Sequence, residues 1–585
     1  MQNPNKALWL LLLASVSLGS GCTQLASRPA SEEPALPQEA VEQSPDEDAV
    51  TGPLPKIELT TPLLYRLLVA EFAEQAGVLR LSAEQYLYAA EETRDPRLAK
   101  HATRVAMYGN EAALATRAAA LWQTLAPEDR EADQALAAVL ISENRLAEAR
   151  PHLERIIQAP AKQGGAHGYL IAANLLGRAS DKKQALALMD ELVRPHSHEA
   201  EPLFAAASLA AQLEQPEQAL ARLDQVLRID PHHLQALITK ARLLHATNRK
   251  EEAITTLRSA VNEVPDNTQL RTVYARMLID DRRLDEARNE FRIVDRKAPN
   301  DPDVIYALGL LALQANDLAD GEKQFLRLLS LGQREAEANY ALAQIAETRG
   351  DTDKAIAYYE AVSDGDNVLD ARLRAAMLVA KRDGIDQGRN YLHNIRPDNA
   401  ADAIRVWLME GELLRQAERY DEAMVVYDDA LALFPDNPEL LYARAMMAER
   451  IDRLDILEAD LRAILRQNPD DAQALNALGY TLADRTNRYA EAYQLVEKAL
   501  RLSPDDAAIL DSMGWVLYRQ GRYDESIRYL KQAFAKQQDP ELAAHLGEVL
   551  WVSGQQNEAR RIWDAALKQW PEHKVLRQTI ERFAQ

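Results

Sequence analysis

One small residue, in most cases glycine or alanine, appears along this chain at nearly constant intervals. Near the C-terminus it is Gly547, Gly514, Gly479, Ala445 and Gly411, separated by 33 to 35 residues. The series continues upstream, with one step of 36, through Ala376, Ala343, Gly309, Ala275, Ala241, Ala207, Ala173, Ala137 and Thr103. Such a period over this much chain is typical of an array in which each unit packs mainly on its neighbours. We therefore expect a stack of similar units and not one large core.

Each unit shows helical periodicity in two segments. We number each unit so that the residue seven before the small residue is position 1 and the small residue is position 8. Large apolar groups at positions 4, 7 and 11 then lie with position 8 on one face of a helix. In the unit that begins at Ile404, position 7 is Glu410, a departure from this pattern. The second segment carries its stripe at positions 20, 24 and 27, here Ala423, Tyr427 and Ala430. Small residues at positions 8, 20 and 27 allow two antiparallel helices to approach closely, which offsets the helix propensity that glycine loses.

The pattern resembles the tetratricopeptide repeat (TPR). The segments that carry the resemblance are "WLMEGELLRQAERYDEAMVVYDDALALFPDNP", "LNALGYTLADRTNRYAEAYQLVEKALRLSPDD" and "LDSMGWVLYRQGRYDESIRYLKQAF". The resemblance implies an all-α superhelical solenoid of about 11–15 helix pairs. We expect degenerate helical repeats over 61–130, the solenoid over 131–571 and a capping helix over 572–585.

The first 22 residues predict a lipoprotein signal. Lys6 is followed by the apolar run "ALWLLLLASVSL", which is shorter than the about twenty residues that span a bilayer. "LGSGC" resembles a lipobox, although Gly19 takes the place of the usual aliphatic residue and Leu18 lies one position further upstream. The resemblance implies a signal peptide over 1–21 and acyl chains such as palmitate on Cys22. Since Thr23 and not aspartate would follow the lipidated cysteine, the periplasmic face of the outer membrane is favoured. A cleaved, soluble periplasmic form is the alternative.

The segment 22–60 predicts an extended tether. It is dense in Pro, Glu, Asp and Ser, and its low hydrophobicity gives it too little apolar surface to form a core. Cys22 is the only cysteine in the chain, so no internal disulfide is expected.

Charge and motifs argue against several function classes. The net charge of −22 and the lack of a clustered basic stretch argue against a nucleic-acid partner. The sequence has no P-loop, no G-x-S-x-G elbow and no H-E-x-x-H. Histidines at 196, 198, 232 and 233 fall at equivalent inter-repeat turns, where solvated residues are favoured over a metal site. We expect no enzyme activity, no catalytic residue, no cofactor and no metal.

The first helix of each unit predicts a binding groove. Positions 2, 5, 9 and 12 lie opposite the packing stripe, and Tyr, Trp and Arg on one exposed strip are typical of protein interfaces. The predicted groove residues are Phe204, Arg242, Arg276, Tyr306, Tyr340, Tyr442, Tyr480, Trp515, Tyr518 and Trp551. The alternative for any single ring is packing against the adjacent repeat.

An apolar excess marks the N-terminal helices. The stretch "TPLLYRLLVAEFAEQAG" suits recognition of a helix in a groove, and it predicts a docking segment for a partner. The residues are Leu63, Leu64, Leu67, Leu68 and Phe72. An ordinary N-terminal cap is the alternative.

The layout of signal, tether and long acidic array resembles the bacterial TPR lipoproteins that bind periplasmic carboxyl-terminal processing proteases, as in Pseudomonas. The resemblance implies an adaptor that docks a serine protease and presents substrates such as peptidoglycan hydrolases to it. The alternative is a structural scaffold of an envelope assembly or of a polysaccharide-export machine. An enzyme with an unrecognised site is a distant third.

Overall fold

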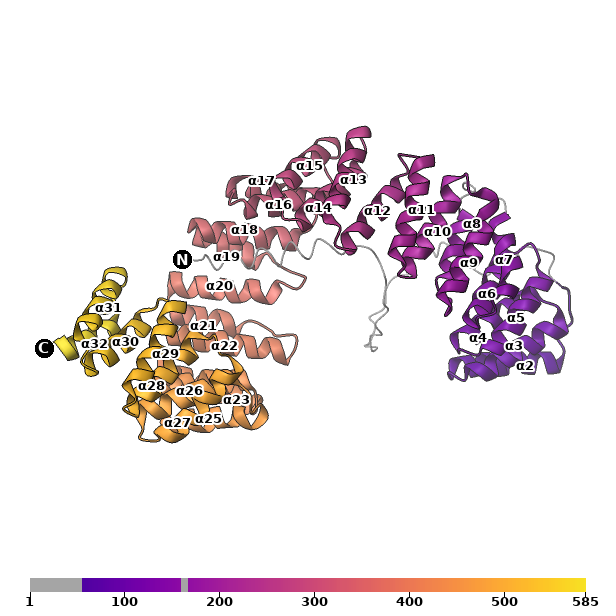
Figure 1. Ribbon diagram of the computed structural model, residues 1–585. Coiled ribbons are helices and arrows are strands. Elements are labelled where there is room, and N and C mark those ends of the chain that lie inside the picture. The colour runs from indigo at the N-terminus through magenta and orange to yellow at the C-terminus, as the bar shows by residue number, and fades with distance from the viewer. Residues whose placement is uncertain (1–54, 159–166, 585) are drawn as a thin grey trace. The chain divides into compact units, whose positions relative to one another are not determined.

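The computed structural model describes residues 55–158 and 167–584. All regular structure in these ranges is helical, as the sequence predicted: helices α2–α32 and one short 3-10 helix, η1 (Arg194–His196). The chain divides between Gln324 and Phe325 into two compact units, which are described separately. Figure 1 shows that the helices of each unit follow one another as antiparallel neighbours.

The first unit holds the helices up to α16 and the beginning of α17. Their bounds are α2 (Thr61–Gln75), α3 (Leu79–Thr93), α4 (Pro96–Tyr108), α5 (Ala112–Leu125), α6 (Arg130–Ser142), α7 (Leu146–Gln158), α8 (His167–Leu176), α9 (Lys182–Val193), α10 (Ala200–Gln212), α11 (Pro216–Ile229), α12 (Leu234–Ala246), α13 (Lys250–Glu263), α14 (Thr268–Asp280), α15 (Leu284–Lys297), α16 (Pro302–Gln314) and α17 (Leu318–Ser330).

The second unit holds the remaining helices. Their bounds are α18 (Glu335–Arg349), α19 (Thr352–Glu360), α20 (Val368–Asp383), α21 (Ile385–His393), α22 (Ala400–Gln416), α23 (Tyr420–Leu433), α24 (Pro438–Arg450), α25 (Leu454–Gln467), α26 (Ala472–Arg485), α27 (Tyr489–Leu502), α28 (Ala507–Arg519), α29 (Tyr523–Lys536), α30 (Pro540–Val552), α31 (Gln556–Gln569) and α32 (Lys574–Ala584).

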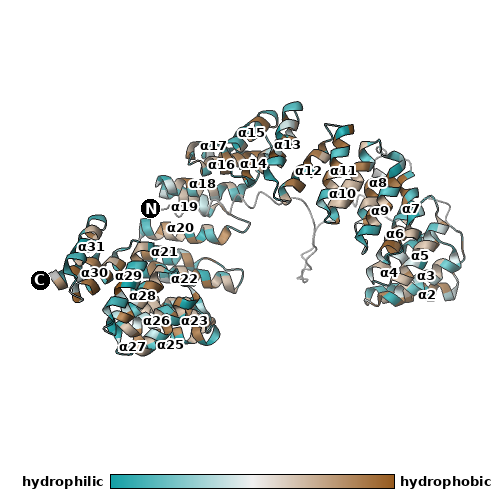
Figure 2. Ribbon diagram, in the orientation of Figure 1, coloured by the Kyte–Doolittle hydropathy of each residue, from teal (hydrophilic) through white to brown (hydrophobic). Residues whose placement is uncertain are grey.

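The helices α2–α31 form fifteen consecutive pairs, at the upper end of the predicted range, and α32 follows the last pair. Every recurring small residue from Thr103 to Gly547 is buried, and each lies on the first helix of its pair. Figure 2 shows that single helices carry both hydrophobic and hydrophilic residues, as expected when one stripe packs and another faces water. The predicted register of the array is therefore confirmed.

The glycines at position 8 are packing contacts. A Cβ added at Gly514 would lie 2.5 Å from Leu530 Cγ, and one added at Gly411 would lie 2.1 Å from the Tyr427 hydroxyl oxygen. Leu530 and Tyr427 occupy position 24 of their repeat units, which lies on the second helix of each pair. The large position-24 side chain thus fills the space that the glycine leaves open.

The turn inside most pairs uses a residue with positive φ. Asn248, Asn316 and Glu418 have φ of 61°, 58° and 57°, and Gly521 holds the same place with φ 78°. The pair α26 and α27 differs, because Thr486 ends α26 in an extended conformation with φ −138° and ψ 179°. The Thr486 hydroxyl donates to the Leu482 carbonyl at 2.5 Å and accepts from the Arg488 backbone N–H at 3.1 Å. This turn accommodates the one extra residue between Gly479 and Gly514.

Residues 1–54 lie outside the described ranges, so the signal peptide, Cys22 and most of the tether remain predictions. Within the ranges that the structure describes, every helix falls short of the length and apolarity needed to cross a bilayer.

Candidate protein-binding face

The candidate site is a surface on the first helices of the second unit. We call the first-helix face the surface formed by positions 2, 5, 9 and 12 of α18, α20, α22, α24, α26, α28 and α30. In the sequence these positions include Tyr340, Met377, Glu412, Tyr442, Glu449, Tyr480, Asp511, Trp515, Tyr518, Glu541, Glu548 and Trp551. Rings, carboxylates and a methionine therefore share one set of helix positions.

Trp515 is packed between successive first helices and is only 7% exposed. Its indole N–H donates to Asp484 Oδ1 on α26 at 3.1 Å. On the other side its ring stacks on His545 of α30, with centroids 4.2 Å apart. The expectation that Trp515 is left free for a ligand is wrong, because a ring at position 9 reaches the first helices on both sides.

Tyr518 also bridges α28 and α30, although it is only half-buried. Its hydroxyl donates to Glu548 Oε1 at 3.1 Å, and Arg582 of α32 forms an ion pair with the same carboxylate. Burial, together with the charge of Glu548, raises the pKa of Tyr518 to about 12. Burial also raises the pKa of Glu548, and neither Arg582 nor Tyr518 reverses that shift.

His545 connects these groups. Its Nδ1 lies 2.8 Å from Asp511 Oδ2, and its ring centroid lies 4.2 Å from that of Trp515 and 6.1 Å from that of Tyr480. Burial alone would lower the pKa of His545, but the Asp511 carboxylate outweighs burial and the net shift is upward. The Asp511 carboxylate therefore favours the protonated form of the imidazole.

The other predicted groove rings divide into two sets. Tyr340, Tyr306 and Phe204 are buried, and the hydroxyl of Tyr340 donates to Asp370 of α20. Tyr340 and Phe204 contact the following repeat and Tyr306 is buried, so the predicted exposure of these three rings is wrong. The half-buried rings are Tyr442, Tyr480, Tyr518 and Trp551. Trp551 stacks on Trp563 at 5.7 Å between centroids and carries the guanidinium of Arg560 at 5.3 Å.

The predicted groove arginines lie in the first unit. Arg242 on α12 is exposed, and Arg276 on α14 is half-buried with its Nε unpartnered among the described groups. Phe204, from the same unit, packs on His233 with ring centroids 5.0 Å apart. Phe204, Arg242 and Arg276 thus belong to the first unit, whereas the predicted groove rings from Tyr340 onward belong to the second.

A cavity of about 1050 Å³ opens on the first helices α18, α20 and α22. Its apolar lining includes Met377, Leu408 and Met409, and its charged lining includes Arg374 and Arg405. The neighbouring second helices α19 and α21 have only 9 residues each, whereas α23 has 14. The cavity therefore coincides with the least regular part of the repeat array in this unit.

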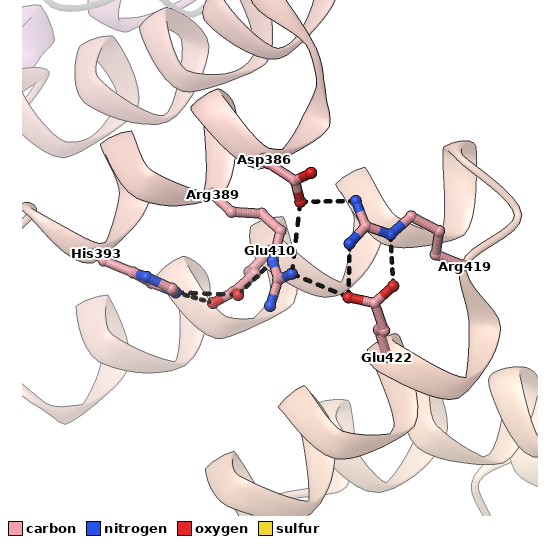
Figure 3. Close-up of polar contacts among 6 residues, drawn as sticks. All are labelled: Asp386, Arg389, His393, Glu410, Arg419 and Glu422. Carbon is pink, nitrogen blue, oxygen red and sulfur yellow. Dashed lines mark hydrogen bonds and ion pairs between the residues drawn. The ribbon is translucent and has the colours of Figure 1, made fainter.

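Glu410 explains how this irregular part is held together. The residue is 2% exposed and occupies position 7, where the repeat calls for a large apolar group. Arg389 Nε lies 2.9 Å from Glu410 Oε1, and His393 Nε2 lies 3.0 Å from both carboxylate oxygens (Figure 3). A buried carboxylate needs such partners to offset its lost hydration.

The network extends to the next helix. Arg389 also reaches Glu422 of α23 at 3.2 Å. Arg419, in the turn before α23, pairs with Asp386 of α21 at 2.7 Å and with Glu422 at 2.6 Å (Figure 3). Helices α21, α22 and α23 are thus joined by charged groups at a place where the array lacks its usual apolar contact.

The predicted docking residues of α2 do not all lie on one face. Leu63 is buried and Leu67 packs on the core cluster around Tyr86. Leu64, Leu68 and Phe72 are 43%, 47% and 64% exposed and follow one another at spacings of four. Three of the five residues therefore form an exposed apolar stripe on the helix.

The inter-repeat histidines pair with single glutamates. His196 lies 2.9 Å from Glu199, and His233 lies 3.5 Å from Glu201. Among the residues that the structure describes, no three His, Cys, Asp or Glu side chains are grouped as a metal ion requires.

Comparison with known proteins identifies the repeat. Family models of the tetratricopeptide repeat match residues 210–277, 306–367, 404–447, 470–539 and 512–574. The chain therefore contains tetratricopeptide repeats over these residues. Repeats of this type are scaffolds for protein–protein interaction, which makes the chain a protein-binding scaffold.

A TPR repeat-containing protein of Pseudomonas aeruginosa is 37% identical to this TPR protein over 211 residues. The alignment covers 36% of this chain and 36% of the relative, so it spans only about a third of the relative's length. A thermophilic TPR protein of Thermus thermophilus is 25% identical, and the match covers 31% of this chain and 96% of that one with a TM-score of 0.28. The hetero-tetramer Cut9-Hcn1 of the APC/C contains a chain 14% identical, with coverage of 84% and 97% and a TM-score of 0.27. Because these TM-scores are low, the fold assignment rests on the repeat models and the helix pairs.

Proposed function

We propose that this chain is a lipid-anchored adaptor on the periplasmic face of the outer membrane. It binds a carboxyl-terminal processing protease and holds substrates such as peptidoglycan hydrolases for that protease. The observation that carries the proposal is the exposed apolar stripe of Leu64, Leu68 and Phe72 on α2. The layout of predicted signal, tether and repeats resembles that of bacterial TPR lipoproteins that bind such proteases.

The stripe suits a helical partner. Helix α2 is the first helix of the array in the described ranges, and its other side packs on α3 through Leu63, Ala70 and Ala73. Side chains at spacings of four lie on one side of a helix, which matches the spacing of anchors in helix-in-groove recognition. Tyr65, which is 69% exposed, extends the apolar surface beside the stripe.

The first-helix face supplies the second binding site. Its half-buried rings and the cavity beside Met377 give a substrate aromatic and apolar contacts. Two sites on one chain convert the encounter of protease and substrate into a local event with a raised effective concentration. A lipid on Cys22 and a tether over 22–60 would keep that event near the membrane.

The test is binding of a purified processing protease to the full chain by biolayer interferometry. Replacing Leu64, Leu68 and Phe72 together by alanine should weaken the complex at least about tenfold, because three exposed apolar anchors are lost. A control replaces Val425, Leu433 and Leu502 by alanine, which are 59%, 64% and 43% exposed on second helices of the second unit. The control should bind as the wild type does.

Equal binding by the α2 variant would reject the docking site. The adaptor proposal as a whole fails if affinity capture from envelope extracts returns only porins or glycan synthases, as a structural envelope scaffold would. A serine protease recovered together with cell-wall hydrolases supports the adaptor.

A further inference from the structure

Five carboxylates gather on the first helices α24–α30. We call the acidic–aromatic cluster the residues Glu449, Asp484, Asp511, Glu541, Glu548, Tyr480, Trp515 and His545. Burial first, and then the charges of Asp484, Asp511, Glu449 and Glu541, raise the pKa of Tyr480 well above its usual value. Four of the carboxylates therefore act on the same phenol ring.

The cations around the cluster neutralise only part of this charge. His545 pairs with Asp511 and Arg582 with Glu548, while Asp484 pairs with Arg485 at 3.3 Å and with Arg519 at 3.6 Å. Glu449 and Glu541 have no cationic partner within 4 Å in the part of the chain that the structure describes. Burial raises the pKa of Glu449, although Arg450 and Arg485 act in the opposite direction.

Asp511 gives an independent sign that a positive group is missing. The residue is 6% exposed, and its Oδ2 accepts from His545. Its Oδ1 is buried and has no hydrogen-bond partner among the described groups. A buried carboxylate oxygen without a donor is costly in free energy. Its negative charge acts at short range on Tyr480 and on any group that binds beside that ring.

We propose that the acidic–aromatic cluster binds an arginine-bearing segment of a partner polypeptide. The inference rests on the proposed scaffold function and names the chemistry of the ligand. A guanidinium group donates two parallel hydrogen bonds to the two oxygens of a carboxylate and also stacks on aromatic rings. A lysine ammonium lacks the planar surface that stacks on Tyr480. Carboxylates that alternate with rings along α24–α30 fit an extended segment better than an isolated ion.

The probe is a short fluorescein-labelled peptide of alternating arginine and glycine, and binding to the full chain is measured by fluorescence anisotropy. Peptides with lysine or with uncharged citrulline in place of arginine are the comparisons. The arginine peptide should bind at least about fivefold more tightly than either, because only it combines charge with a stacking plane.

The variant Glu449→Gln/Glu541→Gln removes the two carboxylates that have no ion pair. It should weaken the arginine peptide about fivefold, with an unchanged thermal midpoint. The matched control is Asp429→Asn/Asp524→Asn, which removes the same charge from exposed positions on the second helices α23 and α29. The control should bind the peptide as the wild type does.

Three results would overturn the inference. They are equal binding of the lysine and arginine peptides, equal binding of the citrulline peptide, and equal weakening by the control variant. The peptide assay contains no protease, so loss of the protease complex with intact peptide binding rejects only the proposed function. A retained protease complex without peptide binding rejects only this inference.

Discussion

Gly547 on α30 lies directly against the indole of Trp563 on α31: a Cβ at this glycine would fall 2.0 Å from Trp563 Nε1. The ring is 2% exposed and also stacks on Trp551 and Phe583. No side chain larger than hydrogen fits at position 547 while Trp563 keeps this place.

The variant Gly547→Ala should therefore destabilise the protein. Alanine gains about 1 kcal/mol of helix propensity, but overlap in a packed core costs about 1–3 kcal/mol. We expect a net loss of stability in urea unfolding. Adding Trp563→Leu, which removes the indole, should make the alanine nearly neutral relative to Trp563→Leu alone. Equal costs of the alanine in both backgrounds would show that the ring contact is not the cause.

Glu410 offers a second test. Glu410→Gln keeps the shape but leaves Arg389 and His393 without a buried anion, so it should cost about 1–3 kcal/mol of unfolding free energy. The comparison is Glu422→Gln, whose side chain is 47% exposed and whose replacement should cost clearly less than that of Glu410. Denaturant unfolding followed by circular dichroism measures both. Similar costs for the two variants would contradict the role given to burial.

Trp515 should behave as a core residue. Trp515 is only 7% exposed, so Trp515→Ala removes a buried side chain and should lower the free energy of unfolding by about 3–5 kcal/mol. Tyr518→Phe loses one hydrogen bond, to Glu548, and should cost about 1 kcal/mol. Thermal unfolding separates the two. A Trp515→Ala variant with wild-type stability would restore the idea that this ring is free for ligands.

His545 predicts a pH dependence. Its pKa is raised in the folded state, so its stabilising contribution is complete below about pH 6.5 and is lost as pH rises through the folded pKa. The variant His545→Gln removes this contribution, while Asp511, Glu541 and Glu548 stay in place. The difference in thermal midpoint between wild type and variant should be largest near pH 6 and should shrink towards pH 9. A difference that grows with pH would contradict the assignment.

Cys22 tests the proposed anchor. Cys22→Ser removes the thiol that would carry the lipid, so the protein should move from the membrane fraction to the soluble periplasmic fraction. Incorporation of labelled palmitate should be lost as well. Unchanged fractionation of the serine variant would reject lipid anchoring.

The helix pairs could be predicted because their signals are local. Position 8, the second-helix stripe and the turn residues all recur within one period, and a helix face is defined by a few neighbouring residues. The contact of Gly514 with the second helix follows from the same count. The burial of this position in every unit is the direct consequence of that periodicity.

The exposure of the rings could not be predicted in the same way. Whether Trp515 faces water depends on how closely α26, α28 and α30 approach one another, which is a relation between units. Glu410 shows the same limit, since its partners Arg389 and His393 belong to the preceding pair. Sequence spacing placed the rings on the correct helix positions but did not reveal that Asp484 and His545 lie beside Trp515.

The extended Thr486 separates the length of a turn from the packing of the helices that it joins. The extra residue at this turn leaves Gly479 buried, with Val496 Cγ2 2.6 Å from where its Cβ would lie. In evolutionary terms, insertion of a single codon at such a turn leaves the packing of the core unchanged. Duplication of a whole period instead adds one further helix pair to the binding surface. The array can therefore change the reach of its binding surface without redesigning any helix interface.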